Sequence, residues 1–172
     1  MVSKVHHRWK SFELVEESLV FPDGKTRSQT TLRHPGAVVI IALTEQGNVL
    51  LLKQFRAAFN DWILELPAGT VDENESFYQC AKRELPEETG YSAAQWHTLG
   101  SLYAAPGFCD EMLEIYVAQQ LTHTEATSDE DEFIEVIEVD IPTLKRWSVD
   151  GTLNDSKSLA ALYRYFLVHE PQ

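Results

Sequence analysis

The chain has 172 residues, of which 44% are hydrophobic, so it can bury the core of one compact domain and is not globally disordered. Its 14 basic and 27 acidic side chains give a formal net charge of −13, which disfavours binding to the phosphate backbone of nucleic acids. The longest apolar run, Ala37 to Leu43, is much shorter than the ~20 residues that a membrane-spanning helix needs.

The first part of the chain, residues 5–32, has two β-rich runs separated by Pro22-Asp23-Gly24-Lys25. Proline presets one φ angle of a turn and glycine accepts a positive φ, so this tetrapeptide predicts a turn between short strands. The β-branched run 38–43 predicts a strand that is buried on both faces. After a turn at Gln46-Gly47-Asn48, we expect residues 49–53 to pair with that strand as a hairpin.

Further along the chain, strands and helices mix without a strict β-α-β alternation, which predicts an α/β fold with mixed sheets. The segment from Ser76 to Thr89 has the signals of a helix: Ser76 and Gln79 form a capping-box pair, and Gly90 follows the last turn. The other expected strands are 62–66, 98–103, 113–118 and 133–139, and the other expected helices are 142–149 and 158–168.

The predicted helix 76–89 carries acidic side chains on the face that should point into the protein. At 100° per residue, Glu84 and Glu88 fall in the centre of its apolar stripe and Glu87 at the edge. Carboxylates this close repel one another and need a positive partner. Because no His or Cys joins them, Mg²⁺ or Mn²⁺ fits better than zinc. A solvated acidic face with lysine partners is the alternative.

Cysteine usage and the N-terminal sequence bear on the compartment. The two cysteines, Cys80 and Cys109, are too few for a disulfide framework and form no CxxC pair for zinc. The N-terminal segment MVSKVHHRWKSFELVEE lacks the apolar stretch of a secretory signal. We therefore expect a cytoplasmic protein whose partners include neither a membrane nor a nucleic acid. An anionic ligand would then require metal ions or a local group of Arg and Lys.

The stretch from Gly69 to Tyr91 has glycines, glutamates and one arginine at fixed spacing, in GTVDENESFYQCAKRELPEETGY. Its pattern is G, five residues, E, seven residues, then R-E-L-x-E-E-x-G and an apolar residue. This pattern resembles the Nudix box at every constrained position. The resemblance implies an α/β/α sandwich with a mixed sheet and metal-dependent hydrolysis of nucleoside diphosphate compounds. It divides the chain into N-terminal antiparallel strands, residues 1–34, and a Nudix hydrolase domain, residues 35–172.

The resemblance also implies roles inside the box. It makes Glu84, Glu87 and Glu88 catalytic metal ligands, together with the backbone carbonyl of Ala68. It implies further that an ion pair between the acidic and basic box residues Glu75 and Arg83 braces the helix.

One position departs from the pattern, because Pro86 stands where a helix former is usual. Proline removes the N–H that would bond to the Lys82 carbonyl and costs ~3 kcal/mol in a helix interior. We therefore expect a local kink or a shortened last turn, which could displace the two glutamates that follow.

Segments outside the box resemble the ADP-ribose pyrophosphatase subgroup, and Pro106, sixteen residues after Gly90, occupies the position that marks it. This resemblance implies cleavage of ADP-ribose to AMP and ribose 5-phosphate. A nucleotide-sugar pyrophosphatase acting on GDP-mannose or ADP-glucose is an alternative, and a weakened module that binds ADP-ribose-like ligands is another. The segments are KQFR at 53–56, WILELPAG at 62–69, PGFCDE at 106–111, DEDEFIEV at 129–136 and DSKSLAAL at 155–162.

Candidate substrate-binding residues lie in these segments and just before them. Arg56 is the first choice for a phosphate clamp and Arg33 the second, because a guanidinium matches phosphate oxygens. Glu65 and Glu111 are candidates to contact the ribose or a basic group. Gly107, in the loop after the box, is a further candidate.

The catalytic base and the base-stacking residue have several candidates. The acidic loop offers Glu130 and Glu132, and the resemblance favours Glu132. An adenine should stack on an aromatic ring, for which Trp9, Phe12 and Phe108 are available. The resemblance implies a homodimer in which the N-terminal strands reach the site of the partner chain, so the partner could supply this ring.

Overall fold

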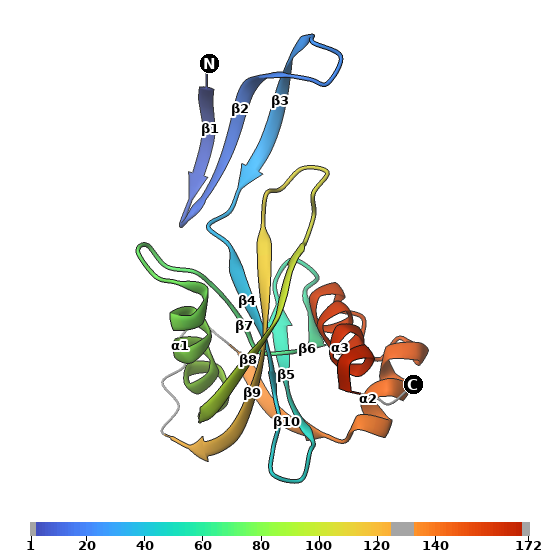
Figure 1. Cartoon of the computed structure of the whole chain (residues 1–172). Helices are drawn as coiled ribbons and strands as arrows, with labels where there is room; N and C mark the ends of the chain where they lie inside the picture. Colours follow the sequence, from blue (N-terminus) through green and yellow to red (C-terminus); the bar gives the residue numbers. More distant parts are fainter. Residues whose placement is uncertain (1–2, 125–132, 170–172) are drawn as a thin grey trace.

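The computed structural model describes residues 3–124 and 133–169. Figure 1 shows an N-terminal sheet that stands apart from a body in which sheets lie between helices. One helix covers one side of these sheets and two helices cover the other, as expected for an α/β/α sandwich (Figure 1). No helix within the described residues is long and apolar enough to cross a membrane. The helices are α1 (Phe77–Thr89), α2 (Ile141–Asp150) and α3 (Ser156–His169).

Two sheets form the body. The first has the order β7-β4-β9-β8, and the second has the order β10-β5-β6. In the first, β4 runs parallel to β9 and antiparallel to β7, so the predicted mixed sheet is confirmed. Its strands are β4 (Ala37–Ala42), β7 (Ala68–Thr70), β8 (Tyr91–Tyr103) and β9 (Met112–His123), and those of the second are β5 (Val49–Arg56), β6 (Asp61–Glu65) and β10 (Ile134–Val139).

The expected hairpin between the buried strand and the next one is wrong. Both edges of β4 are occupied, one by β7 and the other by β9. A single bridge joins Leu43 to Val49, after which β5 enters the second sheet and pairs with β6 and β10. The turn thus carries the chain from one sheet to the other.

Strand β4 is buried on both faces, as its β-branched sequence predicts. Val39 and Ile41 belong to the core beneath α2 and α3, whereas Val38 and Ile40 belong to the core beneath α1. This alternation is the period of two of a β-strand, and each such side chain contributes about 1.5–3 kcal/mol when fully buried. The strand therefore joins the two halves of the core.

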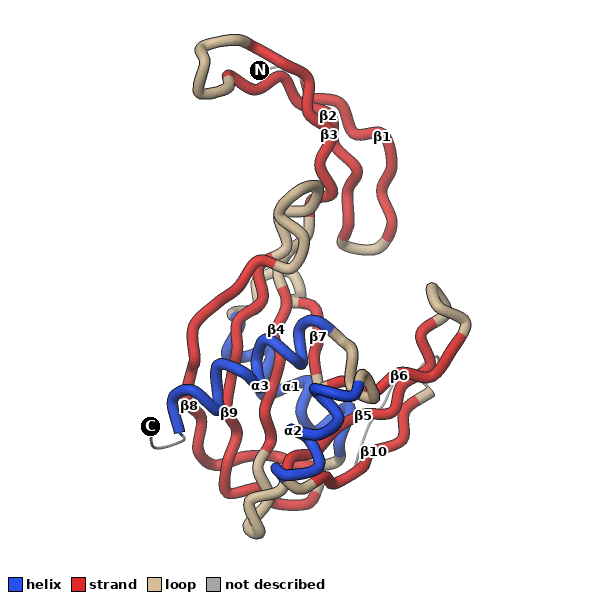
Figure 2. The backbone as a smooth tube through the Cα atoms, turned by 90° about the vertical axis from the view of Figure 1, so that its right-hand side faces the viewer, coloured by secondary structure: helices blue, strands red, loops and turns tan. Residues whose placement is uncertain are grey.

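The N-terminal sheet has the order β1-β2-β3 and extends away from the body, as Figure 2 also shows. It contains three strands and two turns, whereas the sequence indicated two β-rich runs joined by one turn. The first turn, at Lys10 and Ser11, lacks Gly, Pro, Asn and Asp, and Lys10 itself takes a φ of 51°. Val15 is its one buried hydrophobic residue. The strands are β1 (Ser3–Trp9), β2 (Phe12–Val20) and β3 (Thr26–Arg33).

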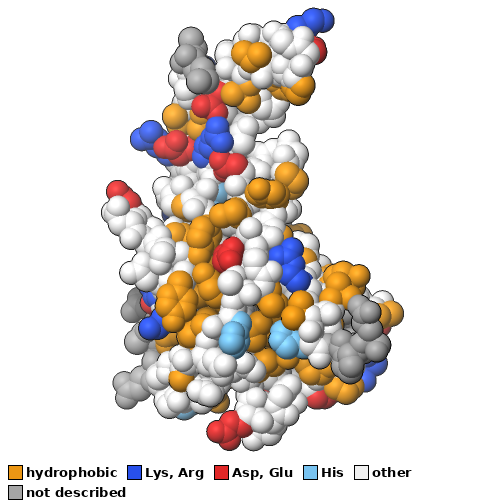
Figure 3. Space-filling view, viewed as in Figure 1, with side chains coloured by type: hydrophobic (Ala, Val, Ile, Leu, Met, Phe, Trp, Pro, Cys, Tyr) orange, Lys and Arg blue, Asp and Glu red, His pale blue; other side chains and the backbone are white. Residues whose placement is uncertain are grey.

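An ion pair and a backbone hydrogen bond to Asp110 connect this sheet to the body. Arg33, at the end of β3, pairs with Glu17 of β2 and, at 2.7 Å, with Asp110 of the body. Figure 3 shows basic and acidic side chains together at the lower end of the N-terminal sheet. The backbone N–H of His34 also donates to Asp110, at 2.8 Å. The carboxylate of Asp110 therefore holds two consecutive residues of the connecting segment.

Candidate active site

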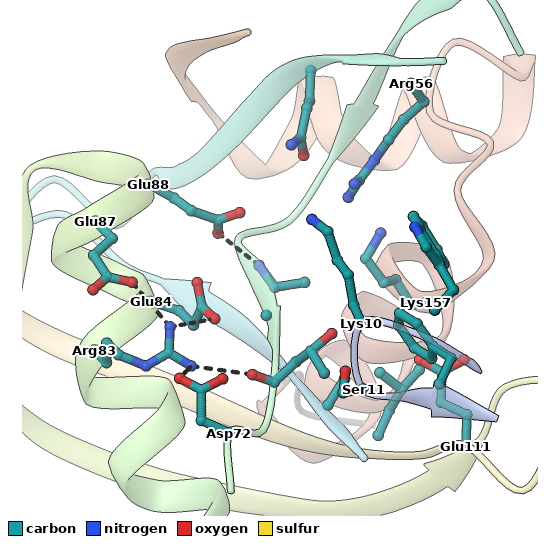
Figure 4. Close-up of a pocket in the computed structure, with 18 residues that line it drawn as sticks. Lys10, Ser11, Arg56, Asp72, Arg83, Glu84, Glu87, Glu88, Glu111 and Lys157 are labelled. Carbon is teal, nitrogen blue, oxygen red and sulfur yellow. Dashed lines mark hydrogen bonds and ion pairs between the residues drawn. The ribbon is translucent and has the colours of Figure 1, made fainter. Parts of the chain in front are cut away.

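A cavity of about 660 Å³ lies between the turn from β1 to β2, the strands β5 and β7, and the helices α1 and α3. Its two sides carry opposite charge. Figure 4 shows the glutamates of α1 on one side and Arg56 and Lys157 on the other. This separation of charge is the main electrostatic feature of the site.

The acidic side follows from the local sequence of α1. Ser76 and Gln79 form the predicted capping box, and Gly90 ends the helix in the left-handed conformation. The side chains of Glu84 and Glu87 are 13% and 35% exposed, and Glu88 is buried. This order of burial agrees with the predicted phase of the helix, in which the 87 position lies at the edge of the inward face.

Arg83 organises the carboxylates of the acidic side. Its Nε donates to Glu75 at 3.0 Å, and its Nη1 donates to Glu84 at 2.7 Å and Glu87 at 3.0 Å. The hydrogen bond with Glu75 is the main reason that the pKa of Arg83 is raised, although burial opposes it. The same hydrogen bonds hold the pKa of Glu75 below its usual value. The predicted brace between these two residues is therefore present.

Gly69 of β7 leaves space that Glu84 fills. A Cβ atom at this glycine would lie 1.9 Å from the carboxylate of Glu84. Next to it, the backbone N–H of Ala68 donates to Glu88 at 2.9 Å. Strand β7 thus positions two of the three glutamates through its backbone.

The oxygen-only donor set of this side fits a hard divalent cation in chemistry. In residues 3–124 and 133–169, however, no three His, Cys, Asp or Glu side chains converge as a ready metal site. Among the described residues, Glu84 and Glu87 accept hydrogen bonds from Arg83, and Glu88 accepts one from the backbone of β7.

Of the two effects expected from Pro86, a local kink or a shortened last turn, the shortened turn is wrong, because α1 extends to Thr89. The carbonyl of Pro86 accepts a hydrogen bond from the N–H of Gly90 at 3.0 Å, so proline takes part in the C-terminal cap. Its missing N–H affects only the bond toward Lys82, which is an exposed residue. The helix therefore keeps its full length beneath the glutamates.

The basic side is assembled around a buried carboxylate. Glu65 is 1% exposed and accepts hydrogen bonds from Arg56 Nε at 2.7 Å and Nη2 at 3.0 Å. Lys157, at the start of α3, also donates to Glu65 and pairs with Asp155 at 3.1 Å. Glu65 does not line the cavity, so its predicted contact with the substrate stays a prediction.

The family of the chain follows from comparison with known proteins. The NUDIX domain model matches residues 32–161, which is most of the chain. The chain belongs to the Nudix family. It is a Nudix hydrolase, and the resemblance of its box is confirmed.

Two relatives and one solved structure illustrate what the chain is similar to. The hydrolase is 36% identical over 155 residues to an ADP-ribose pyrophosphatase of Bacillus subtilis (strain 168), covering 89% of this chain and 84% of that protein. It is 32% identical over 146 residues to a GDP-mannose pyrophosphatase of Yersinia enterocolitica serotype O:8, covering 80% and 75%. A crystal structure of an ADP compounds hydrolase has the same fold, with a TM-score of 0.84 at 23% identity, covering 99% of this chain and 94% of that chain.

Other predicted site residues of this Nudix hydrolase are distributed between two cavities. Glu111 lines the charged cavity, and its Oε1 lies 3.6 Å from Nε2 of His34, a side chain whose pKa is lowered by burial. Gly107 and Phe108 line a second cavity of about 520 Å³ beside β3. Arg33 makes the ion pairs of the connection and lies in neither lining.

The aromatic candidates also separate. Trp9 and Phe12 line the charged cavity and stack with ring centroids 5.5 Å apart at 25°. Phe108 belongs to the second cavity. Glu130 and Glu132, the candidates for the catalytic base, lie outside the described residues.

Sequence reasoning missed several residues that line the charged cavity, among them Gln54, Lys157 and Lys10, which lies in the turn from β1 to β2. Gln54 is 4% exposed, and its Oε1 has no hydrogen-bond partner among the described residues. The period of two along β5 places it on the same face as Arg56, and that signal was available. Lys157 had one weak signal: a cation in the first turn of a helix opposes the helix dipole.

Proposed function

We propose that this Nudix hydrolase cleaves ADP-ribose to AMP and ribose 5-phosphate. The observation that supports it most is the cavity with glutamates on one side, cations on the other and a stacked aromatic pair in its lining. The cations suit a diphosphate and the aromatic pair suits a nucleobase. The 36% identity with an ADP-ribose pyrophosphatase supports the same substrate.

Divalent metal use is general among Nudix hydrolases, and we propose Mg²⁺ as the ion here, with Mn²⁺ as a substitute. Glu84, Glu87, Glu88 and the carbonyl of Ala68 would hold it. When bound, such an ion neutralises the diphosphate and acidifies a water molecule. The hydrogen bonds from Arg83 to Glu75 do not involve these ligands and would hold Arg83 in place beside them.

The remaining roles follow the position of each side chain. Arg56 would clamp a phosphate from the basic side, and Glu111 would contact the ribose. Trp9 and Phe12 would stack on the adenine. Glu132 is our choice for the catalytic base, with Glu130 as the alternative. Arg33 and Gly107, which do not line the charged cavity, stay predictions as substrate-binding residues.

We also propose that the chain acts as a homodimer through residues 1–34. The described part of its N-terminal sheet buries one hydrophobic residue and leaves Val5, Trp9, Leu14 and Val20 exposed. A three-stranded sheet with so little core needs a further surface to cover it. Sedimentation velocity at micromolar concentration should show a dimer, and a fully active monomer would contradict this proposal.

A nucleotide-sugar pyrophosphatase acting on GDP-mannose or ADP-glucose is the second candidate, because relatives named GDP-mannose pyrophosphatase are 32% identical. Initial rates with ADP-ribose, GDP-mannose and ADP-glucose, each with Mg²⁺ and with EDTA, test both. We expect ADP-ribose to be cleaved fastest and EDTA to abolish turnover. Faster cleavage of GDP-mannose would favour the second candidate, and binding without turnover would indicate a weakened module.

The free thiols Cys80 and Cys109 support a cytoplasmic site of action.

A further inference from the structure

Lys157 lies at a position where its positive charge is electrostatically unfavourable. It lies in the first turn of α3, where the partial positive charge of the helix N-terminus disfavours a cation. Two carboxylates, Glu65 and Asp155, hold its ammonium group there. Its side chain is 18% exposed, and it lines the charged cavity. The fold thus places a lysine against the helix dipole and aims it at the site.

The carboxylates that hold Lys157 do not face the cavity themselves. Arg56 and Lys157 both belong to the cavity lining, and neither Glu65 nor Asp155 does. Glu65 is buried behind the two cations and hydrogen-bonded to both. Side-chain rotation is therefore restricted for both cations, and the cavity meets positive charge with the negative charge behind it.

The Asp155 carboxylate is fixed in turn. Its Oδ2 accepts hydrogen bonds from the backbone N–H of Ser158 at 3.0 Å and from the Ser158 hydroxyl at 2.5 Å. That same hydroxyl oxygen accepts the backbone N–H of Leu66 at 2.7 Å, which ties α3 to the strand carrying Glu65. Lys157 is consequently held by groups from two elements that are themselves joined.

We propose that Lys157 binds a phosphoryl oxygen of the substrate beside Arg56, and that Glu65 and Asp155 position it for this. The proposal rests on the proposed function, because it assigns a further residue to the diphosphate. An ammonium has three N–H donors, and its two carboxylate partners occupy two of them. The third is suited to a phosphoryl oxygen, which Lys binds as a point charge. That oxygen belongs either to the phosphate retained in AMP or to the one retained in ribose 5-phosphate.

The test measures dissociation constants of AMP, ribose 5-phosphate and inorganic pyrophosphate by calorimetry in Mg²⁺. Lys157→Met should weaken pyrophosphate binding by about 10- to 100-fold, the range of a hydrogen bond to a charged group. It should weaken one of the two monophosphates much more than the other, which identifies the phosphate. Lys157→Arg should restore most of the affinity. Lys53→Met is the control, because that lysine pairs with Glu135 and does not line the cavity.

A double variant separates binding from mere neutralisation of Glu65. Glu65 also holds Arg56, so Glu65→Gln alone is the reference for the double variant. If Lys157 served only to neutralise the buried carboxylate, adding Lys157→Met to Glu65→Gln would cause no further loss of affinity. We expect the double variant to bind pyrophosphate more weakly than Glu65→Gln alone. Equal binding by these two variants, or unchanged binding in Lys157→Met, would overturn the proposal. Loss of pyrophosphate binding in Lys157→Met would still support it even if the wild type cleaved no ADP-ribose.

Discussion

The two sides of the charged cavity are built in opposite ways. On the acidic side, Glu84 and Glu87 share one cation, Arg83, which comes from their own helix. On the basic side, Arg56 and Lys157 share one carboxylate, Glu65, from a different strand. Each side thus turns one kind of charge toward the cavity, and a residue of the opposite charge organises it. The carboxylates suit a metal ion, and the two cations, whose carboxylate partners do not line the cavity, suit a diphosphate.

The largest expected effect comes from removing a charge on the acidic side. Glu88→Gln should lower kcat on the order of 100-fold or more in saturating Mg²⁺, because a ligand charge is lost while the volume is kept. The amide oxygen can still accept from the N–H of Ala68, so the fold should stay intact. Initial rates and circular dichroism check both statements. Glu73→Gln, at an exposed residue, is the control, and near-normal turnover of Glu88→Gln would contradict its role as a ligand.

A second variant displaces a glutamate without changing any charge. Gly69→Ala places a Cβ where the Glu84 carboxylate lies, so that side chain must move. We expect kcat to fall about 10- to 100-fold, as for a misplaced reacting group, while stability changes by less than about 1 kcal/mol because a flexible side chain yields. The wild type is the reference for the rate, and urea unfolding checks the stability. A kcat equal to that of the wild type would show that Glu84 need not hold this position.

How far each side could be predicted depends on the distance between its residues in the chain. The capping box, the glutamate phase and the glycine end of α1 involve neighbours within a few turns, so the local sequence predicts them. The contact between Glu65 and Lys157 joins residues 92 positions apart, and only the folded chain brings them together. The predicted pairing of β5 with β4 is wrong for the same reason. Strands β7 and β9, which come later in the chain, occupy the edges of β4.

The ion pair between Arg83 and Glu75 on the acidic side can be tested by the pH dependence of stability. The pKa of Glu75 is lowered in the fold, chiefly by its hydrogen bonds from Arg83. A depressed carboxyl pKa contributes stability above the unfolded value of 4.5, and this stability is lost as pH falls through the folded pKa. Glu75→Gln should therefore unfold more easily in urea than the wild type at pH 6, and the difference should shrink below pH 4.5. A difference that stays constant over this range would show that charge is not its cause.

The smallest effect concerns Pro86, which lies beside the glutamates in sequence and outside their hydrogen bonds. Pro86→Ala supplies an N–H for the Lys82 carbonyl and keeps the backbone cap from Gly90. Urea unfolding should show that the free energy of unfolding rises by about 1–3 kcal/mol. The gain should not exceed the full proline penalty, because the helix already accommodates the ring. Activity should stay level or rise.

Pro142→Ala is the control for Pro86→Ala. Proline at the start of α2 lacks an N–H that the helix does not need, so no gain in stability is expected there. A destabilised Pro86→Ala would mean that neighbouring side chains pack around the ring, and a sharp loss of rate would mean that the proline helps to place the acidic side.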